Sequence, residues 1–172
     1  MIKGLALVIH KKICMVGGSA VGKTSLVARF VRGRFSDKYL TTIGVKIDKK
    51  VVEVSGQEVN LILWDLAGED EYMQLRLSYL DGSSGYFLVA DGTRRSTLET
   101  AFDLKAKVEG EIRGAPSILL LNKLDLSDEW DLNDGAMAKL SEAGWDFIHT
   151  SAKTGLGVEE AFLALARKMI SG

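Results

Sequence analysis

The sequence has little of several residue types, and each shortage excludes a class of protein. It contains one cysteine and one proline in 172 residues, so no disulfide can form within the chain and a disulfide-stapled secreted domain is excluded. No apolar run approaches the roughly 20 residues that a membrane-spanning helix requires. The apolar run 5–9 is too short for the core of a signal peptide and lacks a small-residue cleavage site. We therefore expect a cytoplasmic protein.

The sequence also lacks an excess of charge of either sign. Lys and Arg number 22 and Asp and Glu number 23, which gives a net charge of −1. A balanced chain has no long-range attraction for nucleic acid or for an anionic membrane, so neither is expected as a partner. Ile2 stands where myristoylation needs glycine, and no cysteine for prenylation lies near the C-terminus. We expect no intrinsic membrane anchor and a monomeric protein.

What the sequence does have is the composition of one globular domain. Apolar residues make up 47% and charged residues 26%, both near the averages for folded domains. No repeat, linker or low-complexity segment interrupts the chain. We expect a single domain over residues 1–172, with residues 1–11 as a short N-terminal extension and Cys14 in the core. Glycine is enriched, with 18 residues, which indicates several tight turns or close backbone approaches.

Short apolar runs alternate with helix-like segments along the chain. Strands are expected at residues 13–16, 45–54, 59–65, 86–90, 118–121 and 145–149. Helices are expected at residues 23–31, after a capping box at Ser96 and Glu99, and from Val158 onward. Residues 55–58 predict a hairpin with a four-residue loop. The pattern predicts a mostly parallel α/β sheet with one antiparallel strand and helices on both faces, and such sheets bind ligands at the carboxyl ends of their strands.

Residues 17–24 (GGSAVGKT) follow the first expected strand and open the first expected helix, which is the Walker A pattern in its required context. The glycines let backbone N–H groups turn toward phosphate oxygens, and the helix N-terminus adds positive potential. The Lys23 ammonium suits the outer phosphates and the Thr24 hydroxyl suits Mg²⁺. An ordinary glycine turn before a helix is the alternative. The residues expected to bind phosphate or ribose here are Ser19, Ala20, Val21, Gly22, Lys23, Thr24 and Ser25.

A second phosphate element follows the strand-like run 61–64. Asp65 would reach the Mg²⁺ shell from the strand end, through a water molecule, as in a Walker B element. An aspartate that only shapes a turn is the alternative. Gly68 is a candidate for donating its backbone N–H to the terminal phosphate. The two elements together predict a nucleoside triphosphate without identifying its base.

Residues 122–125 (NKLD) follow the apolar strand 118–121 and predict the base. The Asp125 carboxylate can accept two parallel hydrogen bonds, from N1–H and the 2-amino group of guanine, and adenine offers neither donor. Asn122 and Lys123 belong to the same motif. After the run 145–149, the residues Ser151, Ala152 and Lys153 would support the base from the other side. The two motifs disfavour a P-loop ATPase or a small-molecule kinase.

With these motifs in this order, residues 12–170 resemble a small GTPase of the Ras superfamily, most similar to the Rab branch. Rab-like details are the run 37–45 (DKYLTTIGV) and the run 150–155 (TSAKTG) before the last helix. The resemblance implies a P-loop NTPase with a six-stranded, mostly parallel sheet, one antiparallel edge strand and about five flanking helices. It implies a molecular switch that binds GTP or GDP with Mg²⁺ and hydrolyses GTP to GDP and phosphate.

The resemblance also implies roles for single residues. Thr42 would bind Mg²⁺ and the γ-phosphate in the GTP state only, completing a metal set with Thr24 and Asp65. Phe35 would stack on guanine, with a simple loop aromatic as the alternative, and Tyr39 would close over the phosphates. The two switches would be residues 33–44 and 67–80. An effector, an exchange factor and a GTPase-activating protein would bind through these switches.

Other positions carry less specific expectations. Trp64 and Tyr79 match aromatics that Rab proteins present to effectors, with buried core as the alternative, and Ile47 stands where a Rab usually has phenylalanine. Arg94 and Arg95 are interpreted as solvated surface charges. Rab proteins usually carry a long tail ending in cysteines. Either such a tail lies outside this sequence, or the protein works without a lipid, as we would expect of a prokaryotic Rab-like GTPase.

Glu69 departs from the family pattern, which places glutamine after Asp-x-Ala-Gly. Glutamine can accept a hydrogen bond from the attacking water and donate one to the γ-phosphate, whereas an ionised glutamate can only accept and is repelled by phosphate. Lys23, Thr42, Gly68 and Glu69 are the candidate catalytic residues, with slow intrinsic hydrolysis expected. Alternatives are a partner that supplies the missing catalytic groups, and a GTP-binding interaction module with little or no hydrolysis.

Overall fold

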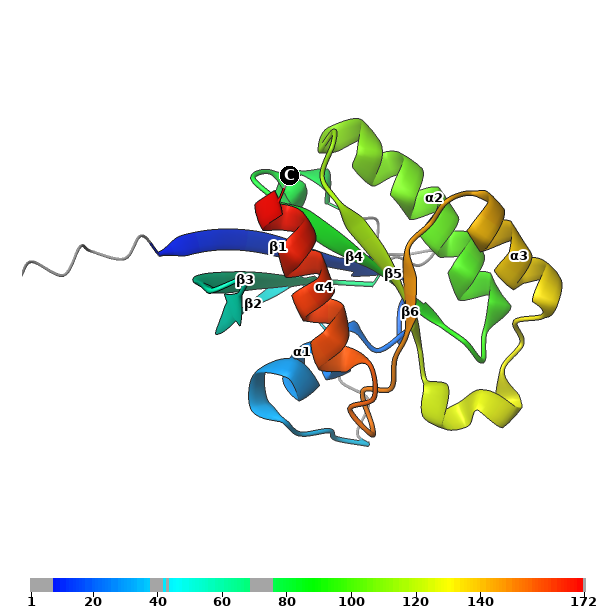
Figure 1. The fold of residues 1–172 in the computed structure, drawn as a ribbon. Coiled ribbons are helices and arrows are strands. Elements are labelled where there is room, and N and C mark those ends of the chain that lie inside the picture. Colours follow the sequence, from blue (N-terminus) through cyan, green and yellow to red (C-terminus); the bar gives the residue numbers. More distant parts are fainter. Residues whose placement is uncertain (1–7, 38–41, 43, 69–75, 172) are drawn as a thin grey trace, which may run out of the picture.

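The computed structural model describes residues 8–37, 42, 44–68 and 76–171, and they form one six-stranded sheet flanked by helices (Figure 1). The strands lie in the order β2-β3-β1-β4-β5-β6. Only the pairing of β2 with β3 is antiparallel, and β2 is an edge strand. The expected fold class is therefore confirmed. The strands are β1 (Ile9–Gly17), β2 (Val45–Val54), β3 (Gln57–Leu66), β4 (Gly85–Asp91), β5 (Ser117–Asn122) and β6 (Phe147–His149).

Helices cover both faces of the sheet. The described part of the chain has α1 (Lys23–Arg32), α2 (Arg95–Glu111), α3 (Asp134–Glu142) and α4 (Val158–Ser171), with 3₁₀ turns η1 (Leu77–Leu80) and η2 (Leu124–Glu129). Helices α1 and α4 lie on one face, and α2 and α3 lie on the other (Figure 1). None of the described helices is long and apolar enough to cross a membrane.

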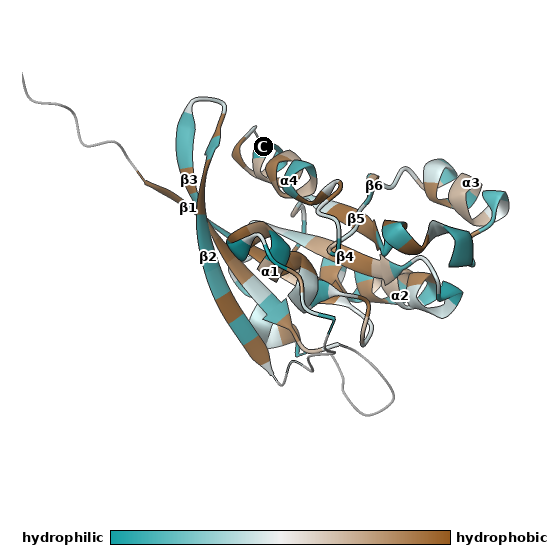
Figure 2. Cartoon of the chain, turned by 90° about the horizontal axis from the view of Figure 1, so that it is seen from below, coloured by the Kyte–Doolittle hydropathy of each residue, from teal (hydrophilic) through white to brown (hydrophobic). Residues whose placement is uncertain are grey.

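The core consists of two apolar clusters, one on each face, because strand residues alternate between faces. Ile13 and Met15 point to the α1/α4 face, where Phe162 stacks on Phe30 with ring centroids 4.0 Å apart. Cys14 points to the α2/α3 face and is fully buried, as expected. The central strand β4 is buried along its whole length and carries mostly apolar residues (Figure 2). This core aligns the carboxyl ends of the parallel strands at one edge.

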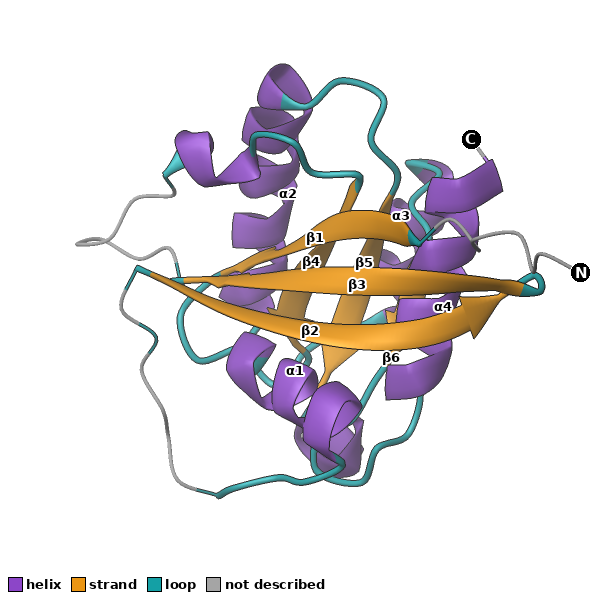
Figure 3. Ribbon diagram, turned by 90° about the vertical axis from the view of Figure 1, so that its left-hand side faces the viewer, coloured by secondary structure: helices purple, strands orange, loops and turns teal. Residues whose placement is uncertain are grey.

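Three details differ from the expectations. The β2–β3 hairpin turns through two residues, Ser55 and Gly56, both with positive φ (51° and 76°), so the four-residue loop was wrong; this turn matches the twist of the strands. The expected capping box was also wrong, since α2 begins at Arg95 and the Thr97 hydroxyl instead accepts from the Asp91 N–H. Strand β1 begins at Ile9, inside the expected extension, and runs beside β3, which separates it from β2 (Figure 3).

Candidate functional site

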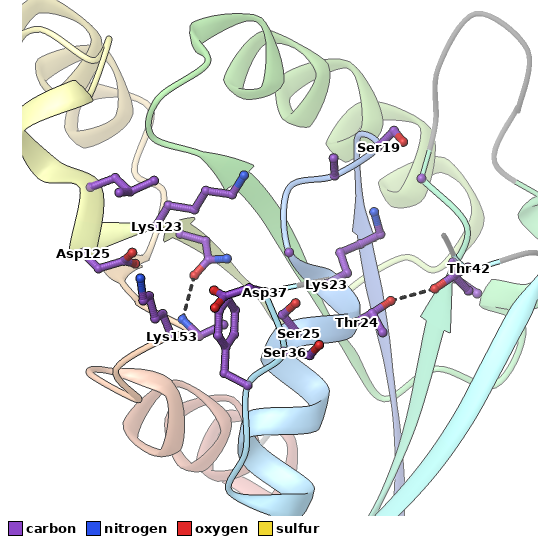
Figure 4. A pocket seen from close by; sticks show the side chains of 18 residues that line it. Ser19, Lys23, Thr24, Ser25, Ser36, Asp37, Thr42, Lys123, Asp125 and Lys153 are labelled. Carbon is purple, nitrogen blue, oxygen red and sulfur yellow. Dashed lines mark hydrogen bonds between the residues drawn. The ribbon is translucent and has the colours of Figure 1, made fainter. Parts of the chain in front are cut away.

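A cavity of about 320 Å³ opens at the carboxyl ends of the parallel strands (Figure 4). Fourteen of its lining residues were expected from the sequence, namely Ser19, Ala20, Gly22, Lys23, Thr24, Ser25, Phe35, Thr42, Gly68, Asn122, Lys123, Asp125, Ala152 and Lys153. Val21, Asp65 and Ser151 are buried beside these residues. Tyr39 and Glu69 lie outside the described residues. Residues that contribute to the wall without having been expected are Ser36, Asp37, Leu66 and Leu126.

One lysine side chain, at the start of α1, is hydrogen-bonded to the phosphate loop between β1 and α1. Lys23 Nζ donates to the carbonyl oxygens of Gly17 at 3.0 Å and Gly18 at 2.7 Å. Burial lowers the pKa of Lys23 to about 8; the Asp65 carboxylate opposes this shift and the Arg94 guanidinium adds to it. A buried cation whose only described hydrogen-bond partners are two neutral carbonyls is well suited to an anion.

Three oxygens gather beside Lys23 where Mg²⁺ is expected. Thr24 Oγ1 donates to Asp65 Oδ2 at 2.5 Å and lies 2.6 Å from Thr42 Oγ1, which is 3.3 Å from that carboxylate oxygen. Burial raises the pKa of Asp65, although the hydrogen bond from Thr24 and the charge of Lys23 oppose the shift. Asp65 Oδ1 is buried and has no hydrogen-bond partner among the described residues. Oxygen donors with an orphaned buried carboxylate oxygen fit a hard divalent cation such as Mg²⁺.

Two glycines are required by close contacts around the phosphate loop. Gly22 has a φ of +105°, and a Cβ there would lie 2.3 Å from Asn122 Nδ2. A Cβ on Gly68 would lie 2.5 Å from the Ser19 Cα atom. The loop therefore touches the base motif on one side and the start of the second switch on the other, and larger residues at either glycine would separate these elements.

The base end of the cavity is held by hydrogen bonds between loops. Asn122 Nδ2 donates to the Val21 carbonyl at 3.0 Å, and Asn122 Oδ1 accepts from Thr150 Oγ1 at 3.1 Å. Ser151 Oγ donates to Asp125 Oδ1 at 2.8 Å. The loops after β5 and β6 are thus joined to each other and to the phosphate loop, which orients the Asp125 carboxylate at the cavity.

Sequence reasoning missed two side chains that support the base end. Arg29, on α1, donates to the carbonyls of Ala152 at 2.8 Å and Lys153 at 2.5 Å. Trp130 donates its indole N–H to the Lys123 carbonyl at 2.8 Å. Neither residue lies in or next to a motif, and each acts on a backbone carbonyl of a distant loop. No signal in a single sequence could have identified them.

Arg94 is exposed, as expected, with 43% of its side chain accessible, but it also makes specific contacts with the protein. Its guanidinium is hydrogen-bonded to Asp91 Oδ2 at 3.0 Å and to the Ser19 carbonyl at 2.9 Å. Arg95 is exposed as well, as expected, but makes no such side-chain contact with the described residues. The two neighbouring arginines differ because only the first lies at the turn between β4 and α2, which faces the phosphate loop.

The aromatic residues of the expected effector surface are half-buried. Trp64 and Tyr79 face each other with ring centroids 6.1 Å apart, and both pack against the core cluster of the α2/α3 face. Ile47 pairs with Trp64 across β2 and β3 and is 47% exposed. Phe35 lines the cavity and also packs against the α1/α4 core, so its position is compatible with both of its interpretations.

A glycine-rich loop between β1 and α1 of this mostly parallel sheet, with a buried lysine, a threonine hydroxyl and a strand-end aspartate beside it, defines a P-loop NTPase. A comparison with protein families identifies the family within this class of P-loop NTPases. The family model described as the Ras family matches residues 12–171, and the chain belongs to that family.

The similar proteins come from the Rab branch. Ras-related protein Rab-13 of Bos taurus is 34% identical over 161 residues, which cover 92% of this chain and 79% of Rab-13. GTP-binding protein yptV2 of Volvox carteri is 34% identical, covering 93% and 75%, and GTP-binding protein ypt2 of Schizosaccharomyces pombe is 31% identical, covering 92% and 80%. The chain is thus a Rab-like small GTPase, a switch protein of a family that binds GTP or GDP with Mg²⁺.

Proposed function

We propose that the cavity holds the guanine nucleotide and Mg²⁺, that residues 1–172 act as a single switch domain, and that this chain hydrolyses GTP slowly. The observation that carries the proposal is the meeting of Thr24, Thr42 and Asp65 beside Lys23. This arrangement joins the phosphate loop, the first switch and the end of β3 in one site. A site that joins the first switch to the phosphate loop can respond to the presence of a γ-phosphate.

At the phosphate end, each expected residue has one task. Lys23 exchanges its two carbonyl partners for phosphate oxygens, and backbone N–H groups of residues 19–22 surround the β-phosphate. Thr24 and Thr42 would supply hydroxyl ligands to Mg²⁺, with Asp65 behind them, and the bound ion would neutralise phosphate charge. The Gly68 N–H donates to the γ-phosphate.

At the base end, selectivity for guanine would rest on Asp125. Ser151 holds one carboxylate oxygen, and N1–H and the 2-amino group of guanine donate to this carboxylate. Phe35 lies in the wall and offers its ring to the base, as does the aliphatic stem of Lys123. Ala152 and Lys153 complete the wall from the loop after β6.

Slow hydrolysis follows from the chemistry of Glu69. An ionised carboxylate cannot donate to the γ-phosphate, and it places a negative charge where further negative charge develops in the transition state. Asp70 and Glu71 add two more carboxylates to the same segment, so the electrostatic cost of a glutamate near GTP is increased further.

Single-turnover hydrolysis of Mg²⁺–GTP by the wild type and Glu69→Gln tests this part. We expect the glutamine variant to be at least about tenfold faster, since it restores a donor that stabilises the transition state. Asp70→Asn is the matched control, with the same change of charge one residue away and a smaller expected effect. A slower Glu69→Gln protein would identify Glu69 as a catalytic residue and refute slow hydrolysis by charge repulsion.

A GTP-binding interaction module is the second candidate, and Glu69 is the feature that favours it. If neither protein hydrolyses GTP above the rate of the buffer while both retain it after purification, the module is supported. We also propose that effector, exchange factor and activating protein bind at the segments around Thr42 and Gly68, where the γ-phosphate would be sensed. Activity that appears only with such a partner would place the missing catalytic groups on that partner.

A further inference from the structure

A buried carboxylate lies between the two ends of the cavity. Asp91 ends β4 and is 1% exposed. Its Oδ1 accepts from the N–H and the hydroxyl of Thr93, at 2.9 and 2.7 Å. Its Oδ2 accepts from Arg94 Nε at 3.0 Å and from Lys123 Nζ at 2.7 Å. Burial alone would raise the pKa of Asp91, but the hydrogen bonds from Lys123, Thr93 and Arg94 hold it below its ordinary value.

The two cationic side chains that bind Asp91 connect it to opposite ends of the cavity. Arg94 also contacts the phosphate loop, where its Nη2 donates to the Ser19 carbonyl at 2.9 Å. Lys123 belongs to the base loop; its backbone is left-handed (φ 73°) and its carbonyl accepts from Trp130. We refer to Arg94, Asp91 and Lys123 as the carboxylate bridge. The bridge joins two loops that are far apart in the sequence through one buried anion.

Each arm of the bridge depends on a specific geometry. A guanidinium is a planar fork and can donate to two acceptors in different directions, whereas an ammonium is a point charge on a flexible stem. Arg94 uses this fork to span Asp91 and Ser19. Since Asp91 is buried, loss of either cation would leave part of its charge uncompensated, which makes the arms depend on each other.

We propose that Arg94 is a positioning residue that slows the release of guanine nucleotide. It fastens the outer turn of the phosphate loop to Asp91, and Asp91 also holds Lys123 at the base end. Opening of either end therefore disturbs contacts that the other end shares. The inference rests on the proposed nucleotide site and adds a residue that contacts neither an expected metal ligand nor, in this structure, the cavity itself.

Release of a fluorescent GDP from the Mg²⁺-loaded protein, chased with excess GDP, tests the proposal. We expect Arg94→Ala to release GDP about tenfold faster, the effect of losing one charge-assisted contact. Arg94→Lys keeps the charge but cannot span both acceptors, so an intermediate rate is expected. Arg95→Ala is the control: it removes the same charge one residue away, and the Arg95 side chain makes no hydrogen bond or ion pair with the rest of the described chain. Its release rate should stay within about twofold of wild type.

The coupling of the two ends is tested by a double-mutant cycle with Lys123→Met. If the bridge acts as a unit, the double variant will release GDP more slowly than the product of the two single effects predicts. A role confined to stabilising the start of α2 would lower the melting temperature without producing this non-additivity. The melting temperature of each GDP-loaded variant is therefore measured in parallel.

Three results would overturn the inference. These are release from Arg94→Ala at the rate of wild type or of Arg95→Ala, equal release from Arg94→Lys and wild type, and strict multiplication of the Arg94→Ala and Lys123→Met effects. Wild-type protein that does not retain GDP would instead refute the proposed nucleotide site, so the two failures can be told apart. The Arg94→Lys variant keeps the test valid if the alanine variant folds poorly.

Discussion

The two ends of the cavity are built on opposite principles. At the base end, the polar groups that define the site are bonded to other parts of the protein, as Asp125 is to Ser151 and Asn122 to Val21 and Thr150. At the phosphate end, Lys23 donates to two carbonyls of the phosphate loop, and we expect it to exchange these partners for phosphate oxygens when nucleotide binds. Asp65 keeps one buried oxygen without a partner in the described chain.

This difference indicates a division of labour. A preorganised base end costs no rearrangement and can select guanine in every state of the protein. A phosphate end whose groups exchange partners responds to what is bound, because its charges are stabilised only when phosphate and Mg²⁺ arrive. On the proposed function, selectivity and switching are separated along one cavity, and the following experiments test that separation.

The largest effect is expected at the phosphate end. Lys23→Met keeps the length of the side chain but removes a buried charge with two phosphate contacts, so GDP affinity should fall about a thousandfold. Preference for GDP over ADP should persist, since the base end is unchanged. Isothermal titration calorimetry measures both. Lys153→Met, at the base end, should lose less than about tenfold; equal losses would show that the two ends do not differ in this way.

The second effect concerns the base end alone. Asp125→Asn replaces one acceptor oxygen by a donor, and we expect GDP affinity to fall about a hundredfold. Xanthosine diphosphate should gain affinity for the same reason, because its 2-oxo group accepts where guanine donates. A competition titration between GDP and xanthosine diphosphate measures this change of base preference. Asp128→Asn, an exposed carboxylate in η2, is the control and should leave the preference unchanged.

The third effect is a pH dependence that belongs to Lys23. Its pKa is lowered to about 8 by burial, and bound phosphate would raise that pKa, so binding favours the protonated lysine. GDP affinity should therefore be constant below pH 8 and fall by up to about tenfold per pH unit above it. Calorimetry in buffers of different ionisation enthalpy should detect proton uptake on binding above pH 8. In Lys23→Met, only the titration of guanine itself should remain; an unchanged profile would contradict the assignment.

The smallest effect is expected behind the base. Arg29→Met removes the donors that hold the Ala152 and Lys153 carbonyls, and GDP release should become about threefold to fivefold faster as the loop loses support. Arg167→Met, an exposed position on α4, should release GDP at the wild-type rate. If Arg29→Met does so as well, other contacts preorganise the base loop.

The local structure of the two motifs was predicted well because a few consecutive residues specify it. The run 17–24 contains its own turn and the start of its own helix, and the run 122–125 follows directly on a buried strand. Errors arose where a local pattern competed with a distant contact. Ser96 and Glu99 have capping spacing, but the Thr97 hydroxyl accepts from the N–H at the end of β4, and α2 begins at Arg95, two residues before the helix start that a Ser96 cap would give.

The sequence alone determined the class of the fold and the family, and it placed the phosphate and base motifs directly after their strands, since backbone turns and neighbouring side chains are specified locally. Only the tertiary structure decided which distant groups contact those motifs. Arg29 and Ala152 are 123 residues apart, and Arg94 and Ser19 are 75 apart. These contacts form because the twisted parallel sheet brings the carboxyl ends of its strands to one edge. The sequence around a single arginine does not indicate which distant loop carbonyl its side chain will contact at that edge.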